Sequence, residues 1–190
     1  WVDLVYEDQG EPLRLHAGNC VIQPPEIRHR VLYASDNIEV IEIGVPAEHV
    51  TTIDHSMELP NKNVNYERRF QGQKFVHHKA GEADWKDFRI PGFNSRDTTI
   101  AHNTQNIAGV QVIRSNETPT QESWHSSDIL FTFMMEGTMT LEGEGKALFD
   151  LSAGDAFVIP PNMKTTYANA SEDLELLEVS LPGKFETHLS

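Results

Sequence analysis

The sequence predicts an all-β protein built from small barrels or sandwiches, and two observations support this fold class. Short apolar runs are separated by Gly, Pro and Asn turns, and no window longer than a turn or two has a helical period. Leu15–Ile53 also align without a gap on Leu151–Leu189, at an offset of 136 residues. Regularly spaced strands that occur twice are typical of an all-β unit present in two copies.

The aligned segments share 11 identical residues in 39 positions, with apolar residues matched to apolar residues elsewhere. We therefore expect two tandem domains joined by a polar connector. Their predicted bounds are 1–53 for the first domain, 54–74 for the connector and 75–190 for the second domain.

The second copy has upstream strand candidates that the first copy lacks. Gly109–Ile113 and Ile129–Met135 are apolar, and their counterparts at the same offset fall before Trp1. We therefore expect the first barrel to be truncated at its N-terminal side by roughly sixty residues. Because half a barrel exposes its edges, residues 1–53 need either that segment or another chain to cover them.

The composition narrows the classes of partner. A formal net charge of -14 repels phosphate backbones and anionic lipid, which argues against nucleic acid and membrane surfaces and favours a neutral or cationic small molecule. No apolar run approaches the roughly 20 residues of a membrane span. Cys20 is the single cysteine, so the chain has no internal disulfide, and a reducing cytoplasm is the expected compartment.

Two motifs carry a resemblance to the cupin superfamily, and specifically to bacterial cupins of two domains. The second cupin motif is Gly, five residues, Pro, one residue, Gly, two residues, His. Its places are taken by Gly18, Pro24, Glu26 and His29 in the first copy, and by Gly154, Pro160, Asn162 and Thr165, followed by Asn169, in the second. The first motif is looser, with Trp124–Ser127 leading through an apolar strand to a turn at Gly137.

The resemblance implies two double-stranded β-helix barrels of the jelly-roll type, each with a ligand cavity in its mouth. Metal-binding cupins hold one divalent ion, commonly iron, manganese, nickel or zinc, with His side chains and a Glu or Gln from both motifs. In the first barrel His29 stands at a ligand place, and the other three ligands would lie upstream of Trp1. We therefore expect a metal site there, against the alternative of a packing or surface histidine.

The second barrel keeps only His125 at a ligand place. Ser127 replaces the second His, Leu130 or Thr132 falls where a carboxylate or amide is expected, and Thr165 replaces the last His. One imidazole among hydroxyls is a poor transition-metal site, so we expect no metal in this barrel. Glu42 and Glu178 alternate with apolar residues and are interpreted as part of a solvated face. The expected cavity-lining residues are Trp124, His125, Phe131, Phe133, Thr165 and Tyr167.

Three functions remain open on the sequence. The first is a metal-dependent, dioxygenase-like enzyme that acts on a small organic substrate in the first barrel. The second is a non-catalytic protein for small-ligand binding or assembly, with a degenerate, metal-free second barrel. The third is an isomerase that works by acid and base, for which the sequence offers His125 and Asp128. Under each of them we expect a homo-oligomer, most simply a dimer, because cupins resemble one another in pairing barrels edge to edge.

Overall fold

The structure, a computed structural model, describes residues 1–46, 58–116 and 121–190. It divides into two compact units, unit 1 at Trp1–Ala80 and unit 2 at Gly81–Ser190. With 45% of residues in strands and 4% in helices, the all-β prediction is confirmed. No helix in the described residues is long and apolar enough to cross a membrane.

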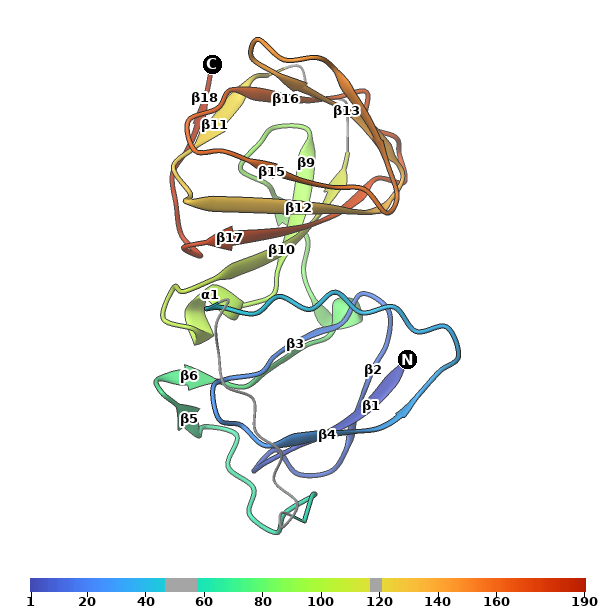
Figure 1. The fold of residues 1–190 in the computed structure, drawn as a ribbon, viewed down its shortest axis with the longest axis vertical. Coiled ribbons are helices and arrows are strands. Elements are labelled where there is room, and N and C mark those ends of the chain that lie inside the picture. The colour runs from blue at the N-terminus through green and yellow to red at the C-terminus, as the bar shows by residue number, and fades with distance from the viewer. Residues whose placement is uncertain (47–57, 117–120) are drawn as a thin grey trace. The chain divides into compact units, whose positions relative to one another are not determined.

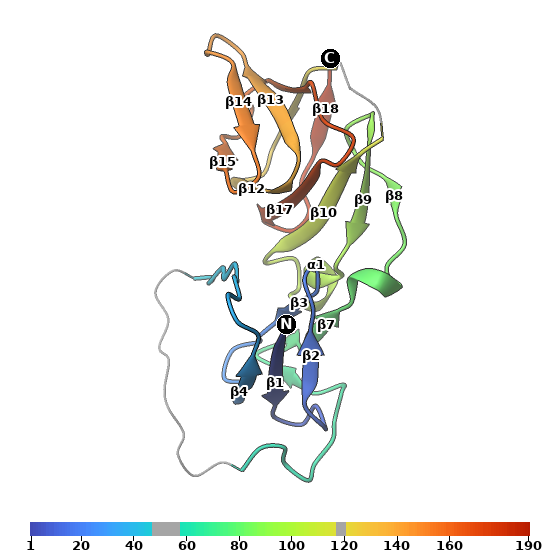
Figure 2. The same ribbon diagram turned by 90° about the vertical axis from the view of Figure 1, so that its right-hand side faces the viewer.

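Unit 2 is a jelly roll of two antiparallel sheets, shown in Figures 1 and 2. In its described residues the first sheet has the strand order β15-β12-β17-β10-β9-β8 and the second has the order β14-β13-β16-β11-β18. The strands are β8 (Lys86–Asp87), β9 (Phe93–Asp97), β10 (Gly109–Ser115), β11 (Ser123–His125), β12 (Ile129–Glu136), β13 (Thr138–Gly143), β14 (Phe149–Ser152), β15 (Ala156–Ile159), β16 (Thr165–Ala168), β17 (Glu175–Leu181) and β18 (Thr187–Leu189). A 3-10 turn at Ala80–Glu82 precedes β8, and the short helix α1 (Ile100–Asn103) lies between β9 and β10.

The core of unit 2 joins the two sheets. Side chains from the first sheet, such as Phe93, Ile113 and Leu176, pack in one cluster with Met139 and Tyr167 from the second. All five are at most 2% exposed. The alternating strand pattern places these residues on the inner faces, so their burial closes the barrel around an apolar centre.

Unit 1 contains smaller pieces of sheet. Among its described residues, β1 (Val2–Tyr6) lies between β2 (Leu13–Leu15) and β4 (His29–Ala34), β3 (Cys20–Ile22) pairs with β7 (Val76–His78), and β5 (Arg69–Phe70) pairs with β6 (Gln73–Lys74). Shifted by 136 residues, β1, β2, β3 and β4 fall on β13, β14, β15 and β16. The order β2-β1-β4 matches β14-β13-β16, and the pair Val2 and Ala34 keeps the register of β13 on β16.

The boundary between the units lies later than the sequence predicts. Phe75–Ala80 group with unit 1 rather than with the second domain because β7 forms a ladder with β3. The predicted connector also packs on unit 1, where Phe70 is buried and Arg68 pairs with Glu7 at 2.7 Å. Residues 47–57, which hold the end of the first predicted domain, Thr51 and the start of the predicted connector, lie outside the described residues.

The turn between β12 and β13 requires a glycine. Gly137 has φ +77°, and a Cβ there would lie 2.7 Å from Leu174 Cα, so Gly137→Ala combines backbone strain with a clash against the backbone. Gly145 has a similar φ of +67° but nothing within 4 Å of its Cβ position. In urea denaturation we expect Gly145→Ala to cost about 1 kcal/mol and Gly137→Ala about 3 kcal/mol. Equal losses in the two variants would contradict the close packing at this turn.

Candidate functional site

The barrel interior of unit 2 receives every second residue of β12. Leu130, Thr132 and Met134 are at most 2% exposed, whereas the residues between them are half-buried. Phe131 and Phe133 therefore lie on the outer face of this strand, and neither lines the cavities described below. This corrects the expectation that both phenylalanines line the ligand cavity. The correct alternation was visible in the sequence, but which face turned inward was not.

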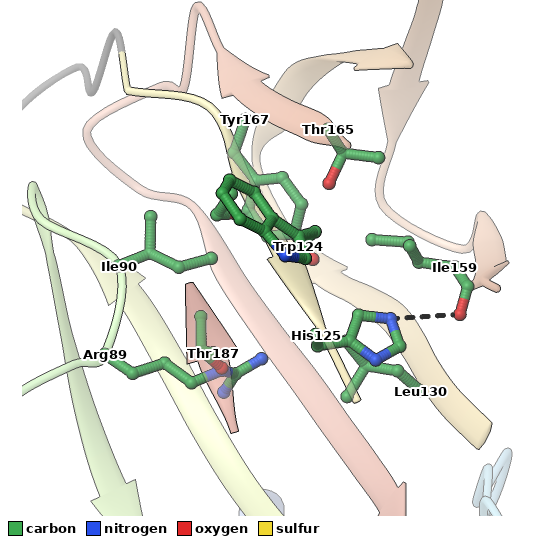
Figure 3. Close-up of a pocket in the computed structure, with 10 residues that line it drawn as sticks. Arg89, Ile90, Trp124, His125, Leu130, Ile159, Thr165, Tyr167 and Thr187 are labelled. Atoms are coloured by element: carbon green, nitrogen blue, oxygen red, sulfur yellow. Dashed lines mark hydrogen bonds between the residues drawn. The ribbon is translucent and has the colours of Figure 1, made fainter. Parts of the chain in front are cut away.

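An inner cavity lies among side chains from both sheets, as Figure 3 shows. Four of the six residues expected from the sequence line it: Trp124, His125, Thr165 and Tyr167. The cavity has a volume of about 10 Å³, which is room for about one water molecule. The hydroxyls of Thr132 and Tyr167 lie close together in the barrel, but neither makes a hydrogen bond of normal geometry with a described residue. The inner cavity is therefore too small for an organic substrate.

Both ring nitrogens of His125 are occupied by backbone atoms. Nε2 lies 3.1 Å from the carbonyl oxygen of Ile159, and Nδ1 lies 3.2 Å from the amide nitrogen of Ser127 (Figure 3 draws the first bond). Since a carbonyl only accepts and an amide only donates, the ring is satisfied as one neutral tautomer with its proton on Nε2. No lone pair of this imidazole remains for a metal ion.

The electrostatic surroundings keep His125 neutral. Burial is the largest cause that lowers its pKa below the ordinary 6.5, and the nearby positive charge of Arg89 lowers it further. Asp128, the acid that the isomerase hypothesis requires, is exposed and does not bond the ring. The pair expected for metal-free acid and base chemistry is therefore not assembled in the described residues.

The side chains at the other ligand positions of this barrel are either already hydrogen-bonded to backbone or are weak metal ligands. The Ser127 hydroxyl lies 2.8 Å from the carbonyl oxygen of Ile129 and 3.0 Å from that of Leu181. Thr132 and Thr165 bring buried hydroxyls, which are weak ligands for first-row cations. The residues present do not fit the transition-metal site of the cupin pattern, which supports the prediction of a metal-free second barrel.

A buried ion pair, which the sequence did not reveal, dominates the polar interior of unit 2. Glu178 is 3% exposed, and its two oxygens accept hydrogen bonds of 2.7 and 2.5 Å from the two terminal nitrogens of Arg89. The guanidinium also lies over the rings of Phe88 and Phe185, with its carbon 4.3 and 4.8 Å from their centroids. The interpretation of Glu178 as part of a solvated face was wrong, because this residue shares the inward face of β17 with Leu176.

An outer cavity of about 250 Å³ adjoins the ion pair. Arg89 lines the inner cavity and Glu178 lines the outer one, so the ion pair contributes a side chain to each space. The outer cavity is lined by β9, α1, β10, β17 and the loop after β17, with polar groups from Asp97, Gln111, Glu178, Ser180 and Lys184 and the ring of Phe185. Its size and mixed lining are those of a site for a small polar molecule.

Two glycines allow the walls of the outer cavity to approach closely. A Cβ on Gly109 would lie 2.8 Å from the carbonyl oxygen of Gly183, and a Cβ on Gly183 would lie 2.7 Å from Ala108. The amide of Gly183 donates to the carbonyl of Asn106 at 3.0 Å, which fixes the loop that carries Lys184 and Phe185. A side chain at either glycine would therefore force the walls of the cavity apart.

His29 occupies a different environment in unit 1. It is exposed at the start of β4, its ring stacks on Tyr6 at 5.5 Å, and its Nδ1 lies 3.2 Å from the carbonyl oxygen of Ile27. If Nδ1 donates this bond, the lone pair of Nε2 stays available, as in histidines that bind metals. Among the described residues no group of three metal-ligating side chains occurs.

Comparison with known families supports the cupin superfamily. Residues 109–180 match the family described as the cupin domain. A search of curated proteins found no significant relative. Among solved structures, the chain is similar in fold to the polyketide cyclase RemF of Streptomyces resistomycificus, with a TM-score of 0.50 and 14% identity over 58% of this chain and 80% of RemF.

Two further structures align with similar coverage. KdgF from a Halomonas species is 21% identical over 56% of this chain and 94% of its own, with a TM-score of 0.48. The nucleoside dehydratase Pac13 of Streptomyces is 14% identical over 60% of this chain and 88% of its own, also with a TM-score of 0.48. At these identities the likeness concerns the fold alone.

The tautomer of His125 can be tested by NMR. We expect its ring to be neutral with the proton on Nε2, and to titrate below 6.5 because burial and Arg89 disfavour the imidazolium. The unfolded chain then binds this proton first as the pH falls, so the contribution of His125 to stability decreases below about pH 6.5. A His125 resonance that titrates at or above 6.5 would contradict the bonding described here.

The ion pair can be tested by a double-mutant cycle. Arg89→Met leaves Glu178 buried without a cation, and we expect it to lower the free energy of unfolding by about 3 kcal/mol. The double variant Arg89→Met with Glu178→Met removes both charges and should recover most of that loss. Lys164→Met, which breaks the partly exposed pair with Glu122, should lower the urea midpoint much less than Arg89→Met. A double variant no more stable than Arg89→Met would show that the two groups are not coupled.

Proposed function

We propose that unit 2 is a metal-independent binding unit that holds a small polar organic molecule in the outer cavity. This proposal rests on the difference between the bonded histidine at the ligand position and the open outer cavity of the same barrel. The imidazole at the ligand place is bonded on both sides to backbone, whereas a cavity of about 250 Å³ with polar walls remains beside the Arg89–Glu178 pair. A binding function is therefore consistent with the volume of the outer cavity and with the polar side chains that line it.

The lining favours a neutral or cationic ligand rich in hydroxyl, amide or amine groups. Gln111 and Ser180 offer donors and acceptors, and Phe185 offers an apolar face. Glu178 is neutralised by Arg89, and the exposed Asp97 adds an acceptor at the rim. Within the lining Lys184 balances the charge of Asp97, so the expectation that anions are disfavoured rests on the formal net charge of the chain, -14.

The same proposal places unit 2 in a two-barrel cupin whose first barrel is represented by unit 1. The internal repeat of the sequence supports this arrangement, and so does the agreement of the strand order β2-β1-β4 with β14-β13-β16. In such a protein the second barrel would bind the ligand, and any metal-dependent reaction would take place in the first barrel.

A second candidate function is a metal-dependent, dioxygenase-like enzyme whose site lies in the first barrel. The specific observation in its favour is the Nδ1 contact of His29 with the carbonyl of Ile27, which leaves Nε2 for a divalent iron, manganese, nickel or zinc ion. Cupins of similar fold include enzymes such as RemF and Pac13. Because His29 is the only ligand of that pattern among the described residues of unit 1, no reaction step is assigned to it.

The binding function is tested by ligand-detected NMR with a library that contains matched neutral polyols, primary amines and carboxylates. We expect hits among the first two classes, and Gln111→Leu should weaken them about 10-fold, the effect of one lost hydrogen bond. Thr166→Val, on the sheet opposite the cavity, serves as the control and should leave affinity unchanged. Hits confined to carboxylates, or affinities unaffected by Gln111→Leu, would contradict the proposed site.

The metal function is tested by elemental analysis of the protein purified without chelator. If His29 is a ligand, metal content should fall several-fold in His29→Gln and stay constant in His125→Gln, since His125 has no free nitrogen. Less than about a tenth of an equivalent of any transition metal in the full-length protein would rule out the metal enzyme. Loss of metal in His125→Gln would instead overturn the metal-free second barrel.

A further inference from the structure

The segment 38–45 of unit 1 exposes an unusual run of apolar side chains. Single exposed apolar residues are common on protein surfaces, but a contiguous run of large ones marks an interaction site. The exposed fractions are 38% for Ile38, 72% for Val40, 44% for Ile41, 45% for Ile43 and 43% for Val45.

The backbone of this segment is also unpaired. Residues 38–45 belong to no strand, and none of them makes a hydrogen bond to another described residue. An extended backbone with free donors and acceptors is a template for strand addition. The apolar side chains and the unpaired backbone would thus both be covered by a β-strand that pairs with this segment.

The internal repeat shows how the equivalent segment is covered. Shifted by 136 residues, 38–45 corresponds to 174–181, which contains β17. In unit 2, β17 pairs with β10 on one side and with β12 on the other. Leu174, Leu176 and Val179 are consequently at most 4% exposed. A segment of the same pattern is therefore stable as the centre of a sheet, between two antiparallel strands.

The two glutamates of this segment indicate that its binding partner carries positive charges. Glu39 and Glu42 correspond to Glu175 and Glu178. In unit 2 these two glutamates pair with Arg96 at 3.5 Å and with Arg89 at 2.5 Å. In the described part of unit 1 neither Glu39 nor Glu42 has a cationic partner. Pairing of 38–45 with the same segment of a second copy would bring glutamates together, which disfavours that occupant.

We propose that 38–45 is the docking site of two apolar strands, one on each side of it and each antiparallel to it, and that these strands and the arginines that pair with Glu39 and Glu42 come from a segment preceding Trp1 in the full-length polypeptide. The order of strands supports this source. In unit 2 the two flanking strands, β10 and β12, precede β13 along the chain, and β13 is the counterpart of β1. The counterparts of β10 and β12 would accordingly precede β1. This proposal is independent of the binding function of unit 2.

The experiment is hydrogen exchange with mass spectrometry on two proteins, the 190-residue chain and a longer chain that also contains the proposed upstream segment. We expect exchange across 38–45 to be at least about 100-fold slower in the extended protein, with a monomeric mass in light scattering. In that protein Glu42→Arg should reverse most of the protection. Glu11→Arg, an exposed site in unit 1, should not.

Three results would overturn the proposal. The first is exchange across 38–45 that is equally fast in both proteins. The second is protection already present in the 190-residue chain that increases with concentration and accompanies a dimeric mass, which would assign the surface to a second copy. The third is protection in the extended protein that Glu42→Arg leaves intact, which would remove the role of charge pairing.

Discussion

The site in unit 2 depends on one buried interaction, the ion pair between Arg89 and Glu178. The alternation of β17 brings a carboxylate into the barrel next to Leu176, where it is 3% exposed. A charge buried in this way requires a partner, and Arg89 supplies two hydrogen bonds together with contacts to two aromatic rings. The pair contributes one side chain to the inner cavity and one to the outer cavity, and the charge of Arg89 helps to keep His125 neutral.

The two histidines at cupin ligand places belong to different motifs of the cupin pattern and lie in different environments. His125 links two segments of the barrel through Ile159 and Ser127, which makes it a packing and hydrogen-bonding residue. His29 has one nitrogen near a carbonyl and an exposed ring. In unit 2 the imidazole at the ligand place is therefore bonded to backbone on both sides, whereas the outer cavity is lined by the polar groups of Asp97, Gln111, Glu178, Ser180 and Lys184.

Much of the fold was accessible from the sequence because it follows from local rules. The repeat at an offset of 136 covers the strands β15 to β17, and the strand candidates at 109–113 and 129–135 fall on β10 and β12. Four of the predicted lining residues lie around the inner cavity. Glu178 was misassigned because alternation gives the period of a strand but not which face is buried, although its spacing of two from Leu176 was a usable signal. Arg89 lies outside the repeat and meets Glu178 across 89 residues, a tertiary contact that no local pattern encodes. The bond from His125 to Ile159 spans 34 residues and was hidden for the same reason.

The most direct test of this account is a crystal structure of the chain with anomalous data collected at the iron, manganese, nickel and zinc edges. The account predicts a guanidinium of Arg89 bound through both terminal nitrogens to Glu178, with His125 bonded to the carbonyl of Ile159 and no anomalous peak inside unit 2. A metal ion coordinated by Nε2 of His125, or a Glu178 side chain turned to solvent, would contradict it.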